Sequence, residues 1–499
     1  MAVEIAPGRP GNLTPEQEEK LRKLWQLVFR VCAVRFDVGE ADAPVPAPVP
    51  ASAPGPTSPA QDKPKKGRLS MFSRRGKKDE SEPDLTPAPS GPPPPVVLSQ
   101  EHEDDKYGQT KHFHDTLATQ SPESIRAAIW GMVKHDHPDA LLLRFLRARK
   151  WDVEKALVML VSTMNWRAQE MKVDDDIMRG GDEAAAIAEK DASNPAAQRL
   201  GHDFLAQARM GKSFIHGADK VGRPICYVRV RLHKQGEQIE ESLEKYTVYV
   251  IETCRHLLQP PIDTATIVFD MTGFSLANMD YTPVKFMIKC FEANYPESLG
   301  AVLVHKAPWV FQGVWRVIKG WLDPVVANKV HFTNNVREME AFISAKQIPK
   351  ELDGDEDWEY RFVEPVPGEN AAMKDVATRD RLLAAHAALV RDFEAATGRW
   401  IAHPGDAEAK ARRAALTDSI REAYWTMDPY IRARSLYDRT GVLLPGGKIQ
   451  FYPAKEQVSE KTVGELTSRV AAVGISDAVT EKVPVQAPEP VKTSPDDLD

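Results

Sequence analysis

The sequence has few cysteines, no long hydrophobic run and no secretory leader. Its four cysteines are spread over 499 residues and form no CxxC pair, which argues against a zinc site or a disulfide framework and favours a reducing cytosol. No stretch of 18 apolar residues occurs, so no membrane-spanning helix is predicted. The N-terminus lacks the apolar segment of a signal peptide. We therefore expect a cytoplasmic protein that is soluble or peripheral at a membrane.

Signatures of catalysis are also missing. No GxSxG elbow occurs, and no GxGxxG follows a strand. Residues 211–213, Gly-Lys-Ser, resemble the end of a P-loop, but the leading glycine is absent and the triplet opens a predicted strand instead of a helix. The histidines at 102–114 lie in a polar segment before the predicted fold, and the net charge of −7 gives no reason to expect nucleic acid. We expect no catalytic residue, metal or cofactor.

Proline is abundant and is concentrated in one segment. Fifteen of the 39 prolines fall in residues 41–100, a composition that buries too little apolar surface to fold. We predict a disordered insert over residues 41–110. The end of the chain is also polar with prolines, so residues 455–499 are predicted to be a disordered tail.

The insert contains a basic cluster. Residues 63–78 hold eight basic side chains and no acidic one, with Ser70 and Ser73 among them. Three interpretations stay open: a solvated charge run, a tether to anionic lipids in which each charge contributes ~1 kcal/mol, and a nuclear-import signal. Phosphorylation of either serine would weaken a lipid tether. A protein partner of the insert also stays open.

Helical periodicity surrounds the insert. Residues 1–40 contain a helix that starts at Thr14 with a capping-box pattern. Residues 111–172 contain three more helices, the first of them starting at Ser121. An isolated amphipathic helix needs a partner, so we expect all four to form one small helical domain across the insert.

Residues 200–365 alternate between strands and helices. Continuous apolar runs at 267–269 and 302–304 are typical of strands buried on both faces. The alternation predicts an α/β fold with a mostly parallel, twisted sheet and crossover helices, preceded by the small helical domain. A C-terminal helical extension is predicted over residues 371–452. The predicted strands are 213–216, 225–231, 264–270, 302–305 and 330–332.

Residues 308–322, PWVFQGVWRVIKGWL, form the most unusual predicted helix. Nine of the fourteen residues after Pro308 are apolar, and three of the ten tryptophans lie here. Pro308 suits a first helical position. The helix would span roughly 21 Å, too short for a bilayer core of ~30 Å. It is interpreted either as a buried core helix or as a lid over an apolar cavity that also touches membrane.

An α/β core, apolar late helices and isolated charges beside them are typical of a lipid carrier. A diacyl lipid has roughly thirty CH₂ groups at ~0.8 kcal/mol each, but a membrane offers the same burial. Selectivity must therefore come from the headgroup, through charge-assisted hydrogen bonds to phosphate.

Several motifs carry a family resemblance. Residues 141–152, LLLRFLRARKWD, closely resemble the signature of CRAL-TRIO proteins, and the sequence is most similar to the fungal phosphatidylinositol transfer proteins of the secretory-pathway type. The resemblance implies a lipid cavity inside the α/β fold, transport of phosphatidylinositol between membranes without covalent chemistry, and peripheral association with endomembranes. The other motifs are Gly222–Pro224, Asp270–Gly273, Tyr295–Glu297 and Leu322–Pro324.

The resemblance also implies a headgroup site. Arg149 and Lys329 would face the phosphate, while Glu297 and Asp219 would orient inositol hydroxyls or the basic groups. The predicted headgroup residues are Arg149, Lys150, Asp219, Glu297 and Lys329.

The sequence departs from the family at a second position. Where the family's phosphatidylcholine site has four hydroxyl side chains, this chain has Ile215, Cys226, Ala265 and Ile267. A choline headgroup would find few donors there. These side chains suit a more apolar second ligand, such as a sterol or an isoprenoid.

In the resembling family, the helix that corresponds to 308–322 is the gate of the lipid cavity. Its predicted gate residues are Trp309, Phe311, Gly313, Trp315 and Trp321. Glycine tolerates more backbone conformations and would ease a gating movement. Two rival functions remain, a lipid-regulated signalling scaffold and a nucleotide-dependent enzyme.

Overall fold

The computed structural model describes residues 5–35 and 105–452. The basic cluster, most of the predicted insert and the predicted tail lie outside the described residues. The helix-capping prediction at the N-terminus is confirmed, because the Thr14 side chain accepts a hydrogen bond from the Gln17 N–H and the Gln17 side chain accepts one from the Thr14 N–H.

A five-stranded sheet lies at the centre of the α/β part. The strand order is β1-β2-β3-β4-β5, in which β1 is antiparallel to β2 and every other pair is parallel. This confirms the predicted mostly parallel sheet. The strands are β1 (Ser213–Ala218), β2 (Pro224–Arg229), β3 (Ala265–Asp270), β4 (Leu299–His305) and β5 (Val330–Thr333).

The two faces of the sheet have different coverings, because successive side chains of a strand point to opposite faces. On one face Phe214 and Tyr227 pack against the chain that follows β5, including Ile343 and Trp358. The other face, with Ile267, looks toward three helices. These are α8 (Glu240–His256), α9 (Tyr281–Lys289) and α10 (Phe311–Trp321).

The helical domain forms beside the sheet. Helix α1 buries Leu24 and Trp25 in a core shared with α4 and α5, so the N-terminal helix does join the helices that follow the insert. The helices are α1 (Pro15–Val31), α2 (Gln109–Thr119), α3 (Pro122–Val133), α4 (Pro138–Ala148) and α5 (Val153–Asn165).

Helix α2 was not predicted, and order within the described residues resumes at Asp105, earlier than expected. The Asp105 carboxylate accepts hydrogen bonds from the N–H groups of Gln109 and Thr110, which starts the helix. Phe113 is fully buried and ties α2 to the core. The sequence alone does not predict α2, because its apolar stripe is short. The Asp105 side chain that accepts its first N–H groups lies four residues before Gln109. Helix α6 (Arg179–Lys190) lies between the two predicted domains, and α7 (Pro195–Arg209) extends from that interval into the predicted 200–365 domain.

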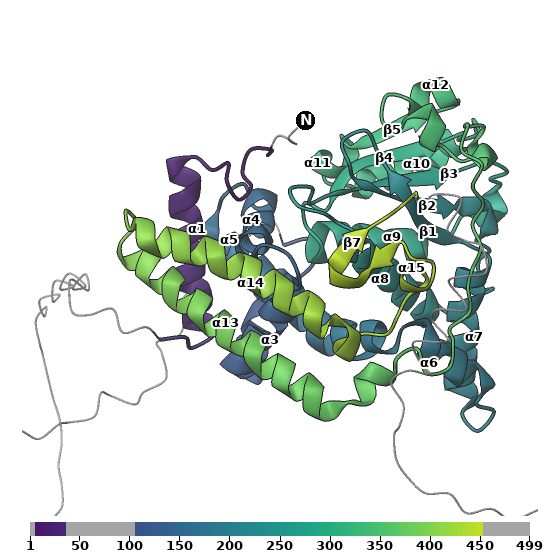
Figure 1. The fold of residues 1–499 in the computed structure, drawn as a ribbon. Coiled ribbons are helices and arrows are strands. Elements are labelled where there is room, and N and C mark those ends of the chain that lie inside the picture. The colour runs from purple at the N-terminus through teal and green to yellow at the C-terminus, as the bar shows by residue number, and fades with distance from the viewer. Residues whose placement is uncertain (1–4, 36–104, 453–499) are drawn as a thin grey trace, which may run out of the picture. The chain divides into compact units, whose positions relative to one another are not determined.

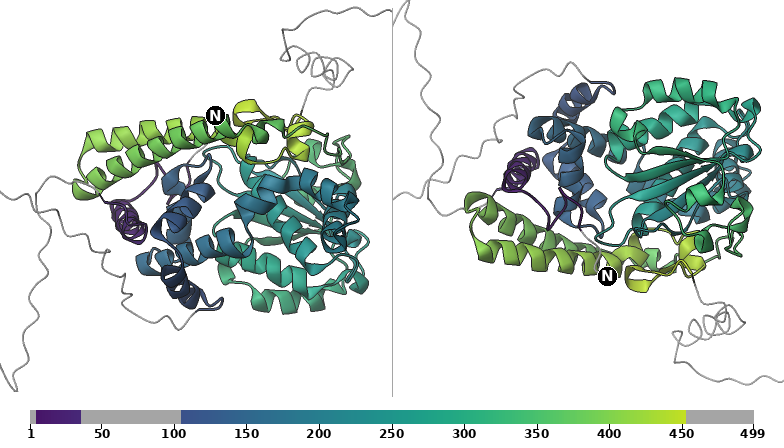
Figure 2. Two further views of the ribbon diagram at one scale, coloured as in Figure 1. Left: turned by 90° about the horizontal axis from the view of Figure 1, so that it is seen from below. Right: turned by 90° about the horizontal axis from the view of Figure 1, so that it is seen from above.

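Two long helices lie within the range of the predicted C-terminal extension. Helices α13 (Val376–Ala402) and α14 (Ala407–Ile431) run side by side from α1 toward the sheet (Figures 1 and 2). One oxygen of Asp139 accepts hydrogen bonds from the Trp25 indole at 2.7 Å and from Arg413 at 2.6 Å, so α1, α4 and α14 share one buried polar contact. The extension is therefore part of the core.

Short elements complete the described fold. Three π-helical turns are η1 (Trp166–Glu170), η2 (Val173–Met178) and η5 (Cys290–Asn294). The 3₁₀ turns are η3 (Val230–Leu232), η4 (Leu276–Asn278), η6 (Ala345–Gln347), η7 (Lys350–Leu352), η8 (Ala371–Lys374) and η9 (Pro445–Gly447). The remaining elements are α11 (Pro324–Ala327), α12 (Val336–Met339), α15 (Leu436–Arg439), β6 (Leu443–Leu444) and β7 (Lys448–Ile449).

Candidate binding site

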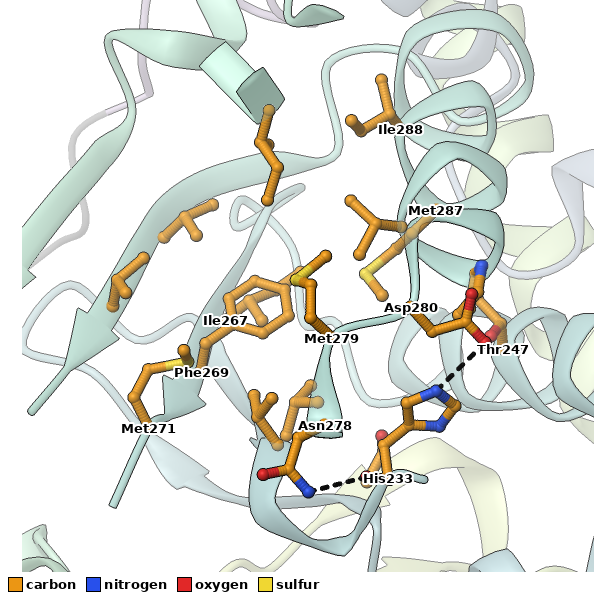
Figure 3. Close-up of a pocket in the computed structure, with 18 of the residues that line it drawn as sticks. His233, Thr247, Ile267, Phe269, Met271, Asn278, Met279, Asp280, Met287 and Ile288 are labelled. Atoms are coloured by element: carbon orange, nitrogen blue, oxygen red, sulfur yellow. Dashed lines mark hydrogen bonds and ion pairs between the residues drawn. The ribbon is translucent and has the colours of Figure 1, made fainter. Parts of the chain in front are cut away.

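An apolar cavity of about 230 Å³ lies between strands β2–β5 and helices α8, α9 and α10. Its wall consists mainly of aliphatic, aromatic and methionine side chains, and Figure 3 shows Ile267 and Phe269 of the sheet opposite Met287 of α9. Phe311 and Trp315 of α10 close one side. We call this space the apolar cavity.

A second pocket, of about 400 Å³, adjoins the apolar cavity. Phe291, Leu299 and Val326 line both spaces, so the two lie side by side. We call the second space the cationic pocket. It brings together four of the five predicted headgroup residues, Arg149, Lys150, Glu297 and Lys329.

The end of α4 positions the two cations of the RARK motif. Lys150 and Trp151 adopt left-handed backbone conformations, with φ of 52° and 66°. The Trp151 N–H donates to the Leu146 carbonyl at 2.7 Å, a bond that closes the last turn of the helix. The chain therefore turns away from α4 directly after Arg149, at Lys150 and Trp151, and Asp152 caps the next helix.

Arg149 is a half-buried cation with a neutral partner. Its guanidinium donates to Oε1 of Gln109 at 2.6 Å, and no carboxylate of the described residues lies within 4.0 Å of it. Burial lowers the pKa of the Arg149 guanidinium from its ordinary value. An anion placed in the pocket would relieve that cost.

Lys329 and Glu297 face each other across the pocket. Their charged atoms are 3.7 Å apart, which is too long for a hydrogen bond, and both side chains are about a quarter exposed. Glu297 has a φ of 55° and its carbonyl accepts a hydrogen bond from Arg144, so the backbone holds it in place. The loose pair leaves both groups available to a ligand.

Asp219 lies outside the cationic pocket. Its carboxylate accepts hydrogen bonds from the N–H groups of Val221 and Arg223 and from the Thr266 hydroxyl at 2.7 Å. These contacts shape the turn between β1 and β2 and fix it to β3. The structure thus groups four of the five predicted headgroup residues and gives Asp219 a different position.

Helix α10 begins later than predicted. Pro308 was expected at a first helical position, but residues 308–310 form a turn in which the Phe311 N–H donates to the Pro308 carbonyl, and the helix begins at Phe311. The turn leaves Trp309 85% exposed. Trp315 lines the apolar cavity, and a Cβ added at Gly313 would meet nothing within 4 Å. The helix has one face on the cavity and one open face.

Polar groups tie the C-terminal end of α10 to the segment before α2. The Glu292 carboxylate accepts hydrogen bonds from Lys106, from the Tyr107 hydroxyl and from the Asp323 N–H, each at 2.6 Å. Lys106 also donates to the Trp321 carbonyl. Burial and the adjacent Glu292 raise the pKa of the Tyr107 hydroxyl. We call these contacts the polar latch.

The polar latch and Gln109 were not predicted, because Lys106, Tyr107 and Gln109 lie inside the predicted insert. The acidic cap at Asp105 followed by Phe113 and Leu117 was the available signal for a helix there. No sequence signal links Tyr107 to Glu292.

The predicted second-ligand residues lie around a smaller adjoining cavity of about 80 Å³. Cys226, Ala265 and Ile267 line it, whereas Ile215 packs in the same apolar cluster without lining it. Ser213, Thr247 and Ser298 also line this cavity. The Thr247 and Ser298 hydroxyls donate to the backbone, so the cavity remains poor in available donors.

The described residues hold little that suits metal or nucleophilic chemistry. Within them, no three His, Cys, Asp or Glu side chains gather as metal ligands would. All four cysteines are buried and unpaired, and burial raises the pKa of Cys226 to about 12, which disfavours the reactive thiolate.

Over residues 5–35 and 105–452, no helix has both the length and the hydropathy needed to cross a bilayer.

Comparison with known families agrees with this architecture. Residues 109–162 match the CRAL/TRIO N-terminal domain, and residues 208–354 match the CRAL/TRIO domain. The chain belongs to the CRAL-TRIO family.

Two fungal relatives cover almost all of the chain. CRAL-TRIO domain-containing protein C3H8.02 of Schizosaccharomyces pombe is 43% identical over 447 residues, which is 88% of this chain and 93% of that protein. Phosphatidylinositol transfer protein CSR1 of Eremothecium gossypii is 37% identical over 460 residues, covering 89% of this chain and 100% of that protein. Among solved structures, Sfh5 aligns with 40% of this chain and 66% of its own, at 20% identity and a TM-score of 0.31.

Proposed function

We propose that this protein binds phosphatidylinositol and carries it between membranes, with the headgroup in the cationic pocket and the acyl chains in the apolar cavity. The observation that carries the proposal is that the two spaces adjoin and share the lining residues Phe291, Leu299 and Val326. An amphipathic lipid needs both environments side by side. The name of the Eremothecium gossypii relative, a phosphatidylinositol transfer protein, supports the same ligand.

The charges of the cationic pocket fit a phosphodiester. Arg149 has no carboxylate partner among the described residues, Lys150 is exposed, and Lys329 is only loosely paired. Charge-assisted hydrogen bonds to phosphate are about twice as strong as neutral ones. Glu297 supplies an acceptor for inositol hydroxyls beside them.

Helix α10 serves as the gate in this proposal. Its inner face closes the apolar cavity, while Arg316, Val317 and Lys319 are exposed and Trp309 projects at its start. Tryptophan with flanking cations suits the membrane interface, where the ring sits among headgroups and the long side chains snorkel. Movement of α10 at the membrane would open the cavity to a lipid.

Transfer between vesicles tests the proposal. Labelled phosphatidylinositol in donor vesicles is followed into acceptor vesicles with wild type, Arg149→Ala, Lys329→Ala and the surface control Lys346→Ala. Each of the two pocket variants should reduce transfer by tenfold or more, since a hydrogen bond to a charged group contributes about 1.5–3 kcal/mol. The control should match wild type. Equal transfer by all four proteins would refute the proposal.

A sterol or isoprenoid is the second candidate ligand, because Cys226, Ala265 and Ile267 form an apolar wall with few available donors. If it occupies the same cavity, cholesterol added to the protein should displace bound phosphatidylinositol. Phosphatidylcholine should displace it less well. The opposite order of displacement would exclude this candidate.

A further inference from the structure

The apolar cavity has a second polar end, which the proposed headgroup site does not use. Lys212, at the start of β1, is 6% exposed and lines the cavity. His233, Asn278 and Asp280 lie near one another at this end, as Figure 3 shows. None of these four residues lines the cationic pocket. Ser213 opens a strand and not a helix, so Lys212 is not a P-loop lysine.

Lys212 has one hydrogen-bond partner among the described residues. Its ammonium donates to Oε1 of Gln238 at 2.8 Å, and no carboxylate of the described chain lies within 4.0 Å. An ammonium has three donors, so two are without a protein acceptor. A buried charge without a counter-ion is costly, and an anionic ligand would offset that cost.

The neighbouring polar groups already have partners. One oxygen of Asp280 accepts from the Thr282 N–H at 3.0 Å, and the other lies 3.4 Å from Nε2 of His233. Asn278 donates to the His233 carbonyl at 2.8 Å, a contact drawn in Figure 3. Arg229 forms a bidentate ion pair with Glu351. Lys212 is therefore the cation at this end whose N–H donors are not all used by the protein.

Lys212 remains largely protonated at neutral pH. Burial lowers its pKa from 10.5 to about 8, and Glu237, Asp280 and Asp203 oppose that shift from longer range. Desolvation also lowers the pKa of His233, which favours the neutral imidazole. Between pH 7 and pH 10, the titrating group at this end of the cavity is Lys212.

We propose that Lys212 binds the carboxylate of a long-chain fatty acid whose hydrocarbon chain lies in the apolar cavity. A single ammonium with two spare donors matches a monoanionic carboxylate. A phosphate would need more hydrogen-bond donors than one ammonium offers. Met271, Met279 and Met287, labelled in Figure 3, give the wall adaptable side chains that fit a flexible chain. The Lys212 site is separate from the cationic pocket, although both ligands would compete for the cavity.

Calorimetric titration of the lipid-free full chain with oleate and with methyl oleate tests the proposal. Wild type should bind oleate at least tenfold more tightly than the methyl ester, because only the free acid carries the charge. Lys212→Met should bind both alike, and Lys212→Arg should keep the preference. Lys346→Met, a substitution on the surface, should behave as wild type does.

The pH dependence of oleate binding by wild type gives a second test, which needs no substitution. Deprotonation of the ammonium removes the attraction, so the preference of wild type for oleate should fall as pH rises from 7 to 10. Affinity for the methyl ester should stay constant over the same range. Equal binding of the two ligands by wild type at pH 7, or a preference that survives in Lys212→Met, would overturn the proposal.

Discussion

The Tyr107 hydroxyl donates a hydrogen bond to the Glu292 carboxylate at 2.6 Å, although 185 positions separate the two residues. The same carboxylate accepts the Asp323 N–H directly after α10. The end of the proposed gate helix is therefore tied to the segment directly before α2. Any outward movement of α10 at this end has to break these bonds or carry both partners along.

Loosening the polar latch should speed lipid exchange. Tyr107→Phe removes one hydrogen bond to a charged acceptor, which contributes about 1.5–3 kcal/mol. If the bond breaks before the cavity opens, the rate of phosphatidylinositol exchange between vesicles should rise by roughly tenfold. Tyr281→Phe is the matched control, because Tyr281 contacts Trp321 through its ring. An unchanged rate in Tyr107→Phe would show that the latch does not limit opening.

Substitution of two tryptophans in the gate region should distinguish contact with the membrane from contact with the bound lipid. Trp309 is exposed, whereas Trp315 lines the apolar cavity and contacts Phe332. Trp309→Ala should slow exchange between vesicles several-fold while leaving the amount of bound lipid unchanged. Trp315→Ala should lower the bound amount. Ile187 is also exposed but lies on α6, so Ile187→Ala should change neither the exchange rate nor the amount of bound lipid. The gate assignment fails if Trp309→Ala reduces the exchange rate and the amount of bound lipid equally.

A buried cluster of charged side chains next to the helical domain should contribute strongly to the unfolding free energy. Glu252 is fully buried and accepts hydrogen bonds from Arg167 at 2.6 Å and from Arg255 at 3.2 Å. Glu252→Gln removes the carboxylate that both arginines share and leaves Arg167 with Asp174 and Arg255 with Asp136, which costs up to about 3–5 kcal/mol of unfolding free energy. Urea denaturation measures this loss. Glu19→Gln removes an exposed pair with Lys23 and should leave the urea midpoint unchanged.

The Glu252 carboxylate should also make the unfolding free energy depend on pH. Burial raises the pKa of Glu252, but Arg167 and Arg255 outweigh it and hold the pKa well below 4.5. A depressed native pKa contributes stability above the unfolded value, and this contribution is lost as pH falls through the native value. Wild type should therefore lose unfolding free energy below about pH 4.5 more steeply than Glu252→Gln. Parallel curves for the two proteins would contradict this.

The strands were the most predictable part of the fold. The run 267–269 is apolar throughout because β3 is covered on both faces, and the other four predicted strands also fall on observed ones. The antiparallel pairing of β1 was not predicted, since strand direction depends on the Asp219 turn and not on composition. The start of α10 was placed at Pro308 instead of Phe311, because proline fits the turn as well as the first helical position.

The candidate site was only partly predictable. Arg149, Lys150, Glu297 and Lys329 could be named because their motifs resemble those of the CRAL-TRIO family, which implies a headgroup site at these positions. Their clustering, the different place of Asp219 and the link from Tyr107 to Glu292 depend on contacts between distant segments. Lys212 was noticed only as part of an apparent P-loop, since its burial beside the apolar cavity is a tertiary property.

The most direct test of the central claim is mass spectrometry of the lipids that co-purify with the protein. Wild type and Lys346→Ala should carry phosphatidylinositol in comparable amounts. The double variant Arg149→Ala/Lys329→Ala should keep its fold by circular dichroism and lose phosphatidylinositol at least tenfold. A double variant that carries as much phosphatidylinositol as wild type would contradict the assignment of the cationic pocket.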